Sequence, residues 1–148
     1  MFDIESKSQD DIILTTKKTT IKINIAESVI DANLSVGKIA GPGEFEIGDA
    51  TIRGIATPSG KTIYDVEIGG VHVGITGGIE ECHDDIVADV LCTSSIRAIR
   101  EIEPKLVVSM GNVDAMVSEL KLSARSEKKL KIKSLDALPT TKEVVVLS

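Results

Sequence analysis

The strongest constraint on the fold is a series of short β-branched segments separated by glycine turns. Four such segments lie within residues 44–75, and they are rich in the Ile, Val and Thr that favour extended backbone. The connections between them are Gly48-Asp49, Pro58-Ser59-Gly60 and Gly69-Gly70. Each connection supplies the positive φ angle or the fixed turn geometry that a hairpin needs. The pattern predicts antiparallel strands at 44–47, 50–56, 62–68 and 71–75.

A second hairpin is predicted upstream, at residues 11–16 and 19–25, with Lys17-Lys18 as its turn. Isoleucines alternate with polar residues in its second strand, so one face of the pair must be covered by a core. The residues between this hairpin and the rigid Gly41-Pro42-Gly43 turn are interpreted as a short polar connection.

The hydrophobic period changes to that of a helix downstream of Gly77-Gly78. Ile96, Ile99 and Ile102 share a helical face, with Ser94 or Ser95 as the candidate N-cap and Pro104 at the end. The remaining predicted segments are an apolar stretch at 84–92, a buried strand at 105–110, an amphipathic helix at 113–122 and strands at 130–132 and 143–147. With no internal repeat or linker, this order predicts one α/β (α+β) domain over residues 1–148, with helices on stacked sheets.

Composition and charge exclude several functions. Aromatic residues make up only 2% of the 148 residues, so Ile, Val, Leu and Ala must fill the core. The net charge of -6 opposes binding to a phosphate backbone, and we expect no nucleic-acid partner. One basic run, Lys128, Lys129, Lys131 and Lys133, alternates with Leu130 and Ile132 and is interpreted as the solvent-exposed face of a strand.

No apolar run approaches the ~18 residues of a membrane span, and the acidic N-terminal segment lacks the features of a signal peptide. The two cysteines, Cys82 and Cys92, cannot form a disulfide framework and are predicted to be reduced thiols. These features predict a cytoplasmic protein that does not contact a membrane.

Four collinear segments carry a family resemblance. They are 41–55 (GPGEFEIGDATIRGI), 62–75 (TIYDVEIGGVHVGI), 102–110 (IEPKLVVSM) and 130–147 (LKIKSLDALPTTKEVVVL). They resemble the zinc-dependent hydrolases of the metallo-β-lactamase fold, in the small branch that includes the ascorbate-phosphate lactonase relatives. The resemblance implies that fold in a reduced size, with stacked β-sheets and flanking helices.

The family's metal ligands are missing from the positions that the resemblance implies. An HxHxDH loop is expected within residues 26–40, which contain no histidine. A bridging Asp and its neighbouring His are expected after residue 75, where the sequence reads Thr76-Gly77-Gly78-Ile79-Glu80. The last His is expected after Met110, where the residue is Gly111. The chain is therefore interpreted as a shortened, degenerate relative with no catalytic or metal-binding residue carried over.

A rebuilt metal site is the alternative, and its candidate ligands are His72, Cys82, His83, Asp84 and Asp85. A catalytic zinc needs about three protein ligands, and the whole chain has only two histidines. His72 is interpreted as a structural or exposed strand residue, and residues 80–85 (EECHDD) as a solvated acidic loop. Two other pairs are candidates: Cys82 with His83 as nucleophile and base, and Glu44 with Glu46 as paired carboxylates. Neighbouring side chains such as Cys82 and His83 rarely reach each other, and a solvated strand face is the simpler interpretation of Glu44 and Glu46.

Two functions follow from these observations. The first is a non-catalytic protein, without a cofactor, that has a structural role or binds a protein partner. A homodimer is the expected assembly, because shortened loops expose apolar surface that a second subunit commonly covers. The alternative is a zinc-dependent hydrolase that uses the rebuilt site on an ester, lactone or phosphodiester.

Overall fold

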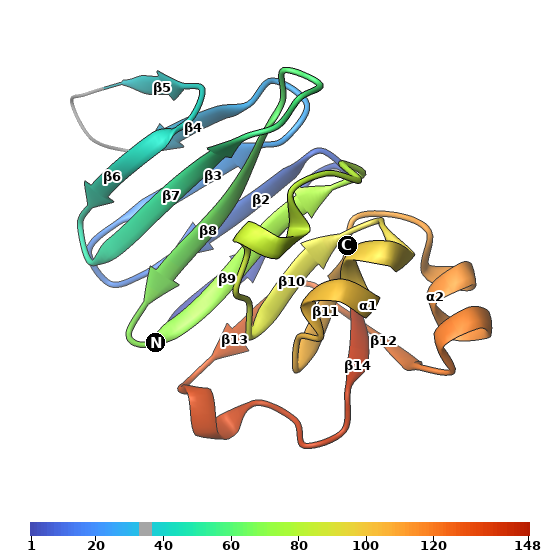
Figure 1. Ribbon diagram of the computed structural model, residues 1–148. Coiled ribbons are helices and arrows are strands. Elements are labelled where there is room, and N and C mark those ends of the chain that lie inside the picture. The colour runs from blue at the N-terminus through green and yellow to red at the C-terminus, as the bar shows by residue number, and fades with distance from the viewer. Residues whose placement is uncertain (33–36) are drawn as a thin grey trace.

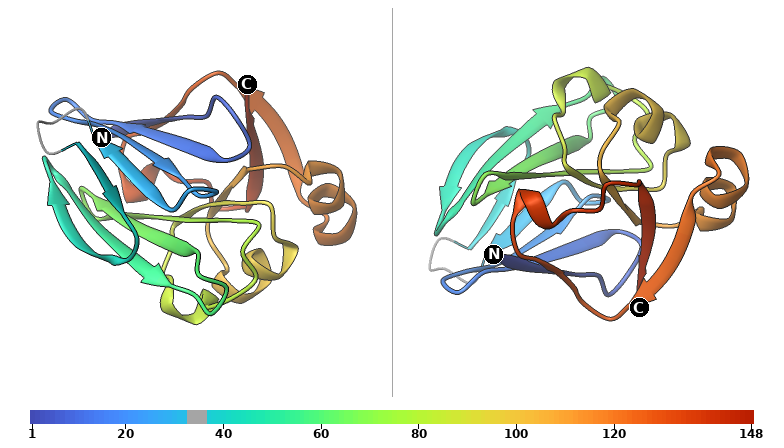
Figure 2. Two further views of the ribbon diagram at one scale, coloured as in Figure 1. Left: turned by 90° about the horizontal axis from the view of Figure 1, so that it is seen from above. Right: turned by 90° about the horizontal axis from the view of Figure 1, so that it is seen from below.

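Two β-sheets are stacked on each other in the computed structural model, which describes residues 1–32 and 37–148 (Figures 1 and 2). Neighbouring strands of the first sheet are all antiparallel. In order across the sheet they are β13 (Leu130–Ile132), β1 (Phe2–Glu5), β2 (Asp11–Thr15), β3 (Thr20–Asn24), β4 (Val29–Ala32) and β5 (Lys38–Ala40).

The second sheet changes direction at its centre. Its order is β12 (Ser123–Glu127), β14 (Glu143–Leu147), β11 (Leu106–Ser109), β10 (Val90–Thr93), β9 (Val71–Gly77), β8 (Thr62–Ile68), β7 (Ala50–Ala56) and β6 (Gly43–Ile47). The strands from β6 to β9 form an antiparallel meander, whereas β9, β10, β11, β14 and β12 run parallel to one another. The carboxyl ends of the parallel strands therefore meet at one edge.

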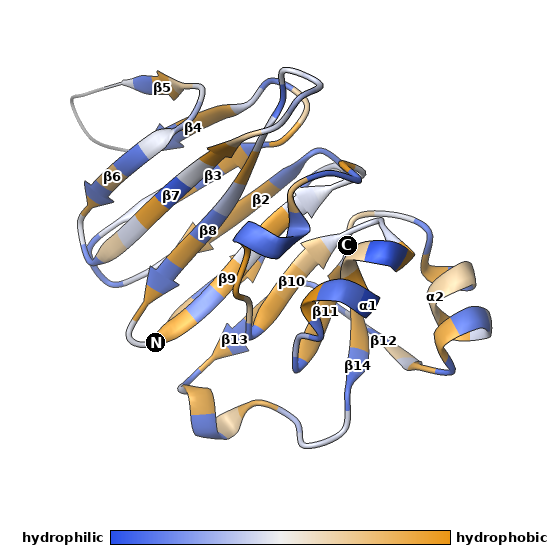
Figure 3. Cartoon of the chain, in the orientation of Figure 1, coloured by the Kyte–Doolittle hydropathy of each residue, from blue (hydrophilic) through white to orange (hydrophobic). Residues whose placement is uncertain are grey.

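The main core lies between the two sheets and follows from the alternation of side chains along each strand. In β3, Ile21 and Ile23 are fully buried while Lys22 between them is exposed. The same alternation of apolar and polar residues is visible along β7 (Figure 3). Tyr64 is fully buried in this core, and burial raises the pKa of its phenol to about 12.

A second core lies on the outer side of the eight-stranded sheet, under two helices (Figure 1). Helix α1 (Ile96–Ile102) begins at Ser95, whose Oγ accepts a hydrogen bond from the amide of Ala98 at 3.0 Å. Helix α2 (Val113–Leu120) contributes Met116, which is fully buried. Because the central strands are covered on both faces, β10 is apolar throughout except for Thr93. Two short 3₁₀ turns complete the chain, at His83–Asp85 and Leu135–Ala137.

The predicted α/β architecture, the meander, the upstream hairpin and both helices are confirmed. Four strands were not predicted: β1, β4, β5 and β12. The stretch interpreted as a polar connection contains β4 and β5, although residues 33–36 within it lie outside the described residues. Strand β12 has almost no apolar residue, so only its pairing with β14 makes it a strand. Within the described ranges, neither helix has the length and apolar character that crossing a bilayer would require.

Candidate functional site

The carboxyl edge of the parallel strands is the first place to look for a site, because open α/β sheets bind ligands beyond the carboxyl ends of their strands. Strand β9 ends in Thr76 and Gly77, β10 in Thr93 and β11 in Ser109. Three of these four residues carry a hydroxyl group and the fourth is glycine. The chemistry of this edge therefore depends on what those hydroxyls contact.

The hydroxyls of β9 and β10 form a closed, buried network. Thr76 Oγ1 donates to Thr93 Oγ1 at 2.8 Å, and Thr93 Oγ1 donates to the carbonyl oxygen of Gly77 at 2.9 Å. Thr93 Oγ1 also accepts from the amide of Ser95 at 3.0 Å. Both threonines are fully buried. Each hydrogen-bonding site of the Thr93 hydroxyl is therefore used to join β9, β10 and the start of α1.

The loop after β11 is also held by side-chain hydrogen bonds to backbone groups. Ser109 Oγ donates to the carbonyl of Gly111 at 2.8 Å and accepts from the amide of Gly111 at 3.1 Å. Asn112 Nδ2 donates to the carbonyl of Ser94 at 3.1 Å, which joins this loop to the one after β10. Gly111 and Asn112 have φ angles of 115° and 67°, a left-handed turn that suits glycine and asparagine.

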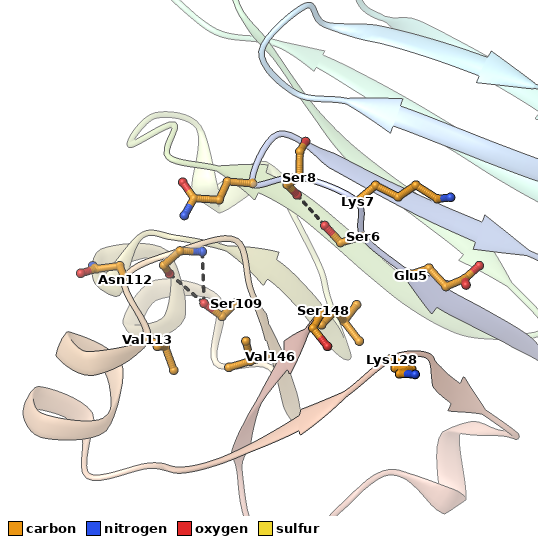
Figure 4. Close-up of a pocket in the computed structure, with 13 residues that line it drawn as sticks. Glu5, Ser6, Lys7, Ser8, Ser109, Asn112, Val113, Lys128, Val146 and Ser148 are labelled. Atoms are coloured by element: carbon orange, nitrogen blue, oxygen red, sulfur yellow. Dashed lines mark hydrogen bonds between the residues drawn. The ribbon is translucent and has the colours of Figure 1, made fainter.

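A cavity of about 720 Å³ opens beside this loop, between the two sheets (Figure 4). Its walls are the β1–β2 connection, the loop after β11 and the end of β14, with Lys128 at one side. Its volume lies in the range of small-molecule pockets. Among the described residues that line it, Glu5 has the sole acidic side chain and there is no His or Cys. Serine hydroxyls, the Gln9 and Asn112 amides and two lysines provide neutral and cationic hydrogen-bonding groups instead.

His83 is buried away from this edge, with 4% of its surface exposed. Its Nδ1 lies 3.0 Å from Glu101 Oε1 and its Nε2 lies 2.8 Å from the carbonyl oxygen of Ile79. Both partners are acceptors, so both contacts are hydrogen bonds only when both ring nitrogens carry protons. The hydrogen bond from His83, assisted by Arg97, lowers the pKa of Glu101. His83 therefore connects the 79–85 segment to α1. The sequence indicated residues 80–85 as a solvated loop, but His83 within it is buried.

His72 lies on the outer face of the second sheet within a charged network. Its Nδ1 is 3.1 Å from Asp65 Oδ1 and its Nε2 is 3.5 Å from Glu67 Oε2. Asp65 is buried and also pairs with Arg53 at 3.3 Å. The network spans β7, β8 and β9, and about a third of the His72 side chain is exposed.

The other candidate ligands are not gathered around either histidine. Cys82 Sγ has the carbonyl oxygen of Ala56 as its partner at 3.8 Å, and Asp84 and Asp85 are exposed. Over residues 1–32 and 37–148, no three His, Cys, Asp or Glu side chains lie close enough together to hold a metal ion. Because both nitrogens of His83 face Glu101 and Ile79, neither is turned toward Cys82 as a base.

The donor groups at the carboxyl edge do not fit zinc. Zinc takes nitrogen, thiolate or carboxylate ligands, whereas this edge has neutral hydroxyls already bonded to one another and to backbone. Where the resemblance places the last histidine, Gly111 forms part of a tight turn. The paired carboxylates Glu44 and Glu46 are both exposed on β6, away from the cavity.

Sequence reasoning did not single out the hydroxyls of Thr93 and Ser109 or the amide of Asn112. The sequence indicated the apolar stretch at 84–92 and the strand at 105–110, which these residues end or follow, but not that the two strands pair in parallel. Nothing in the sequence indicated that the β1–β2 connection lines the cavity, because β1 itself was not predicted.

Comparison with known proteins supports the fold. No family model and no curated protein matches the sequence. Among solved structures, the chain is similar to a Thermotoga maritima protein described as a candidate zinc-dependent hydrolase of the metallo-β-lactamase superfamily. The TM-score is 0.72 at 17% sequence identity, and the match covers 99% of this chain and 98% of that one. The fold is therefore metallo-β-lactamase-like, as predicted, and the low identity restricts the likeness to the fold.

Proposed function

We propose that this chain is a degenerate, non-catalytic member of the metallo-β-lactamase fold that works by binding a protein partner, with a second copy of itself as the first candidate. One observation carries the proposal. The edge at which the resemblance places metal ligands is instead closed by the buried hydrogen bonds of Thr76 and Thr93. A hydroxyl that is fully used in this way stabilises the fold and is not free to activate water.

Exposed apolar side chains support the partner-binding part of the proposal. Val87 is 65% exposed and Val117, on α2, is 40% exposed. Strand β12 borders α2 and lies at the open edge of the eight-stranded sheet, where its backbone pairs with β14 on one side. An exposed valine next to an open sheet edge is a surface that a second subunit can cover.

The oligomeric state tests this part. Light scattering over a concentration series is expected to show a dimer, and Val117→Asp is expected to shift it toward monomer. Ser118→Asp, one residue along the same helix and also exposed, is the matched control. A wild-type chain that stays monomeric at every concentration would remove the homodimer from the proposal.

Metal content and hydrolysis test the non-catalytic part. After purification without chelator, elemental analysis is expected to find far less than one zinc, manganese or iron per chain. Added zinc is expected to restore no hydrolysis of lactone, ester or phosphodiester substrates. Stoichiometric metal together with metal-dependent hydrolysis would replace the proposal with the rebuilt site of His72, Cys82, His83, Asp84 and Asp85.

We also infer a cytoplasmic location from the two cysteines. Both are free thiols, and Cys92 is fully buried, which raises the pKa of its thiol and makes it unreactive. Fractionation of the native host, with immunodetection of the chain, tests the location.

A further inference from the structure

Four lysines line one cavity at the end of the β1–β2 hairpin opposite to the candidate site. The cavity has a volume of about 660 Å³, and the lysines are Lys17, Lys18, Lys131 and Lys133. The first two lie in the β2–β3 turn, and the other two lie in β13 and directly after it. The sequence indicated the whole basic run as a solvated strand face. In the structure, two of its lysines, Lys131 and Lys133, line this cavity together with the β2–β3 turn. We call this cavity the lysine groove.

The lysines of the groove outnumber its carboxylates by two to one, so a net positive charge remains. Across the part of the chain that the structure describes, none of its four ammonium groups has an ion-pair partner within 4.0 Å. Two carboxylates also line the groove and offset part of this charge, but neither is paired with one of its four lysines. Asp49 Oδ1 accepts from Thr16 Oγ1 at 2.7 Å, and Asp3 Oδ2 lies 3.9 Å from Lys129 Nζ. A chain with a net charge of -6 therefore keeps four like charges together.

The backbone that carries these lysines is ordered before any ligand binds. Thr16 Oγ1 accepts from the amides of Lys18 and Thr19, both at 3.1 Å, which fixes the turn. The β6–β7 turn packs closely against the β2–β3 turn, because a Cβ added to Gly48 would lie only 1.8 Å from Thr19 Oγ1. An ordered wall lowers the entropy cost of holding a ligand.

We propose that the lysine groove binds an organic phosphate. A phosphate monoester carries about two negative charges near neutral pH, which suits a cluster of lysines better than a single carboxylate does. The volume exceeds what inorganic phosphate alone fills, and the exposed Met1 side chain offers apolar contact to the organic part. Clefts lined by charge of one sign also concentrate ligands of the opposite sign.

Titration of the whole chain with phenyl phosphate, followed by amide NMR shifts, tests the proposal. We expect saturable shifts at Thr16, Lys18 and Lys133 by about 10 mM, within the weak range of small-ligand affinity. Benzoate and inorganic phosphate are expected to bind at least threefold more weakly. The affinity is expected to fall as salt is added, because exposed charges are screened.

Two paired variants locate the binding. Lys17→Gln with Lys18→Gln, and Lys131→Gln with Lys133→Gln, are each expected to weaken phenyl phosphate binding at least fivefold. The control is Lys105→Gln with Lys121→Gln, which removes the same charge from exposed lysines outside the groove. Absence of saturable shifts, equal binding of benzoate, or an equal loss in the control would each overturn the proposal.

Discussion

Two polar networks on the same eight-stranded sheet differ in what surrounds them. At the carboxyl edge, Thr76 and Thr93 are neutral, fully buried and bonded to one another and to backbone. On the outer face, His72 and Arg53 are partly exposed and share the carboxylate of Asp65. Burial makes each hydrogen bond of the first network costly to lose, whereas water can replace the contacts of the second. The buried network therefore carries structure, and the charged one adds little stability.

Thr93→Val is expected to have the largest effect. Valine keeps the shape but leaves the Ser95 amide and the Thr76 hydroxyl without their partner, while the Gly77 carbonyl keeps its bond from the Ser94 amide at 2.9 Å. Buried groups without partners cost about 1–3 kcal/mol each, so we expect a loss of about 2–4 kcal/mol after partial relaxation. Urea unfolding with an unchanged m-value measures it.

The control for that substitution is Thr51→Val on β7. Thr51 is exposed, and its replacement is expected to change the free energy of unfolding by no more than about 0.5 kcal/mol. Equal effects of the two substitutions would show that the Thr93 network does not stabilise the carboxyl edge.

Acidification is expected to have an intermediate effect through Glu101, an exposed residue of α1 that contacts the buried His83. The hydrogen bond from His83 and the nearby Arg97 hold the pKa of Glu101 below its ordinary 4.5. Its stabilising contribution is therefore fully present above pH 4.5 and is lost as the pH falls through the lowered value. Urea unfolding from pH 7 downward measures the loss.

Glu101→Gln separates this carboxylate from the many others that titrate in the same range. The variant is expected to be less stable than wild type at pH 7, with the difference disappearing at low pH. A difference that is constant with pH would mean that ionisation of Glu101 does not contribute.

His72→Ala is expected to have the smallest effect, no more than about 0.5 kcal/mol in the free energy of unfolding, because the imidazole is about a third exposed and water can take its place. Asp65 keeps its contact with Arg53 in the variant. A loss above about 1.5 kcal/mol, measured by urea unfolding, would remove the distinction between the two networks.

Much of the fold was predictable because its signals are local. Gly69-Gly70 and the alternation on either side predicted β8 and β9, and Ser95 with Pro104 bounded α1 within one or two residues. The candidate site was not predictable, because its groups come from segments more than a hundred residues apart. Gln9 and Asn112 line one cavity only because β1 and β2 pack over the end of β11.

By itself, the sequence determined the strand-rich architecture, the aliphatic core and the shortage of histidine. These depend on residue type and on spacing along the chain, which need no knowledge of distant contacts. The tertiary structure alone decided that Thr76 meets Thr93, that His83 is buried against Glu101 and that four separate lysines share one groove. A hydrogen bond or a field of like charges depends on distances in space, and strand pairing sets those distances.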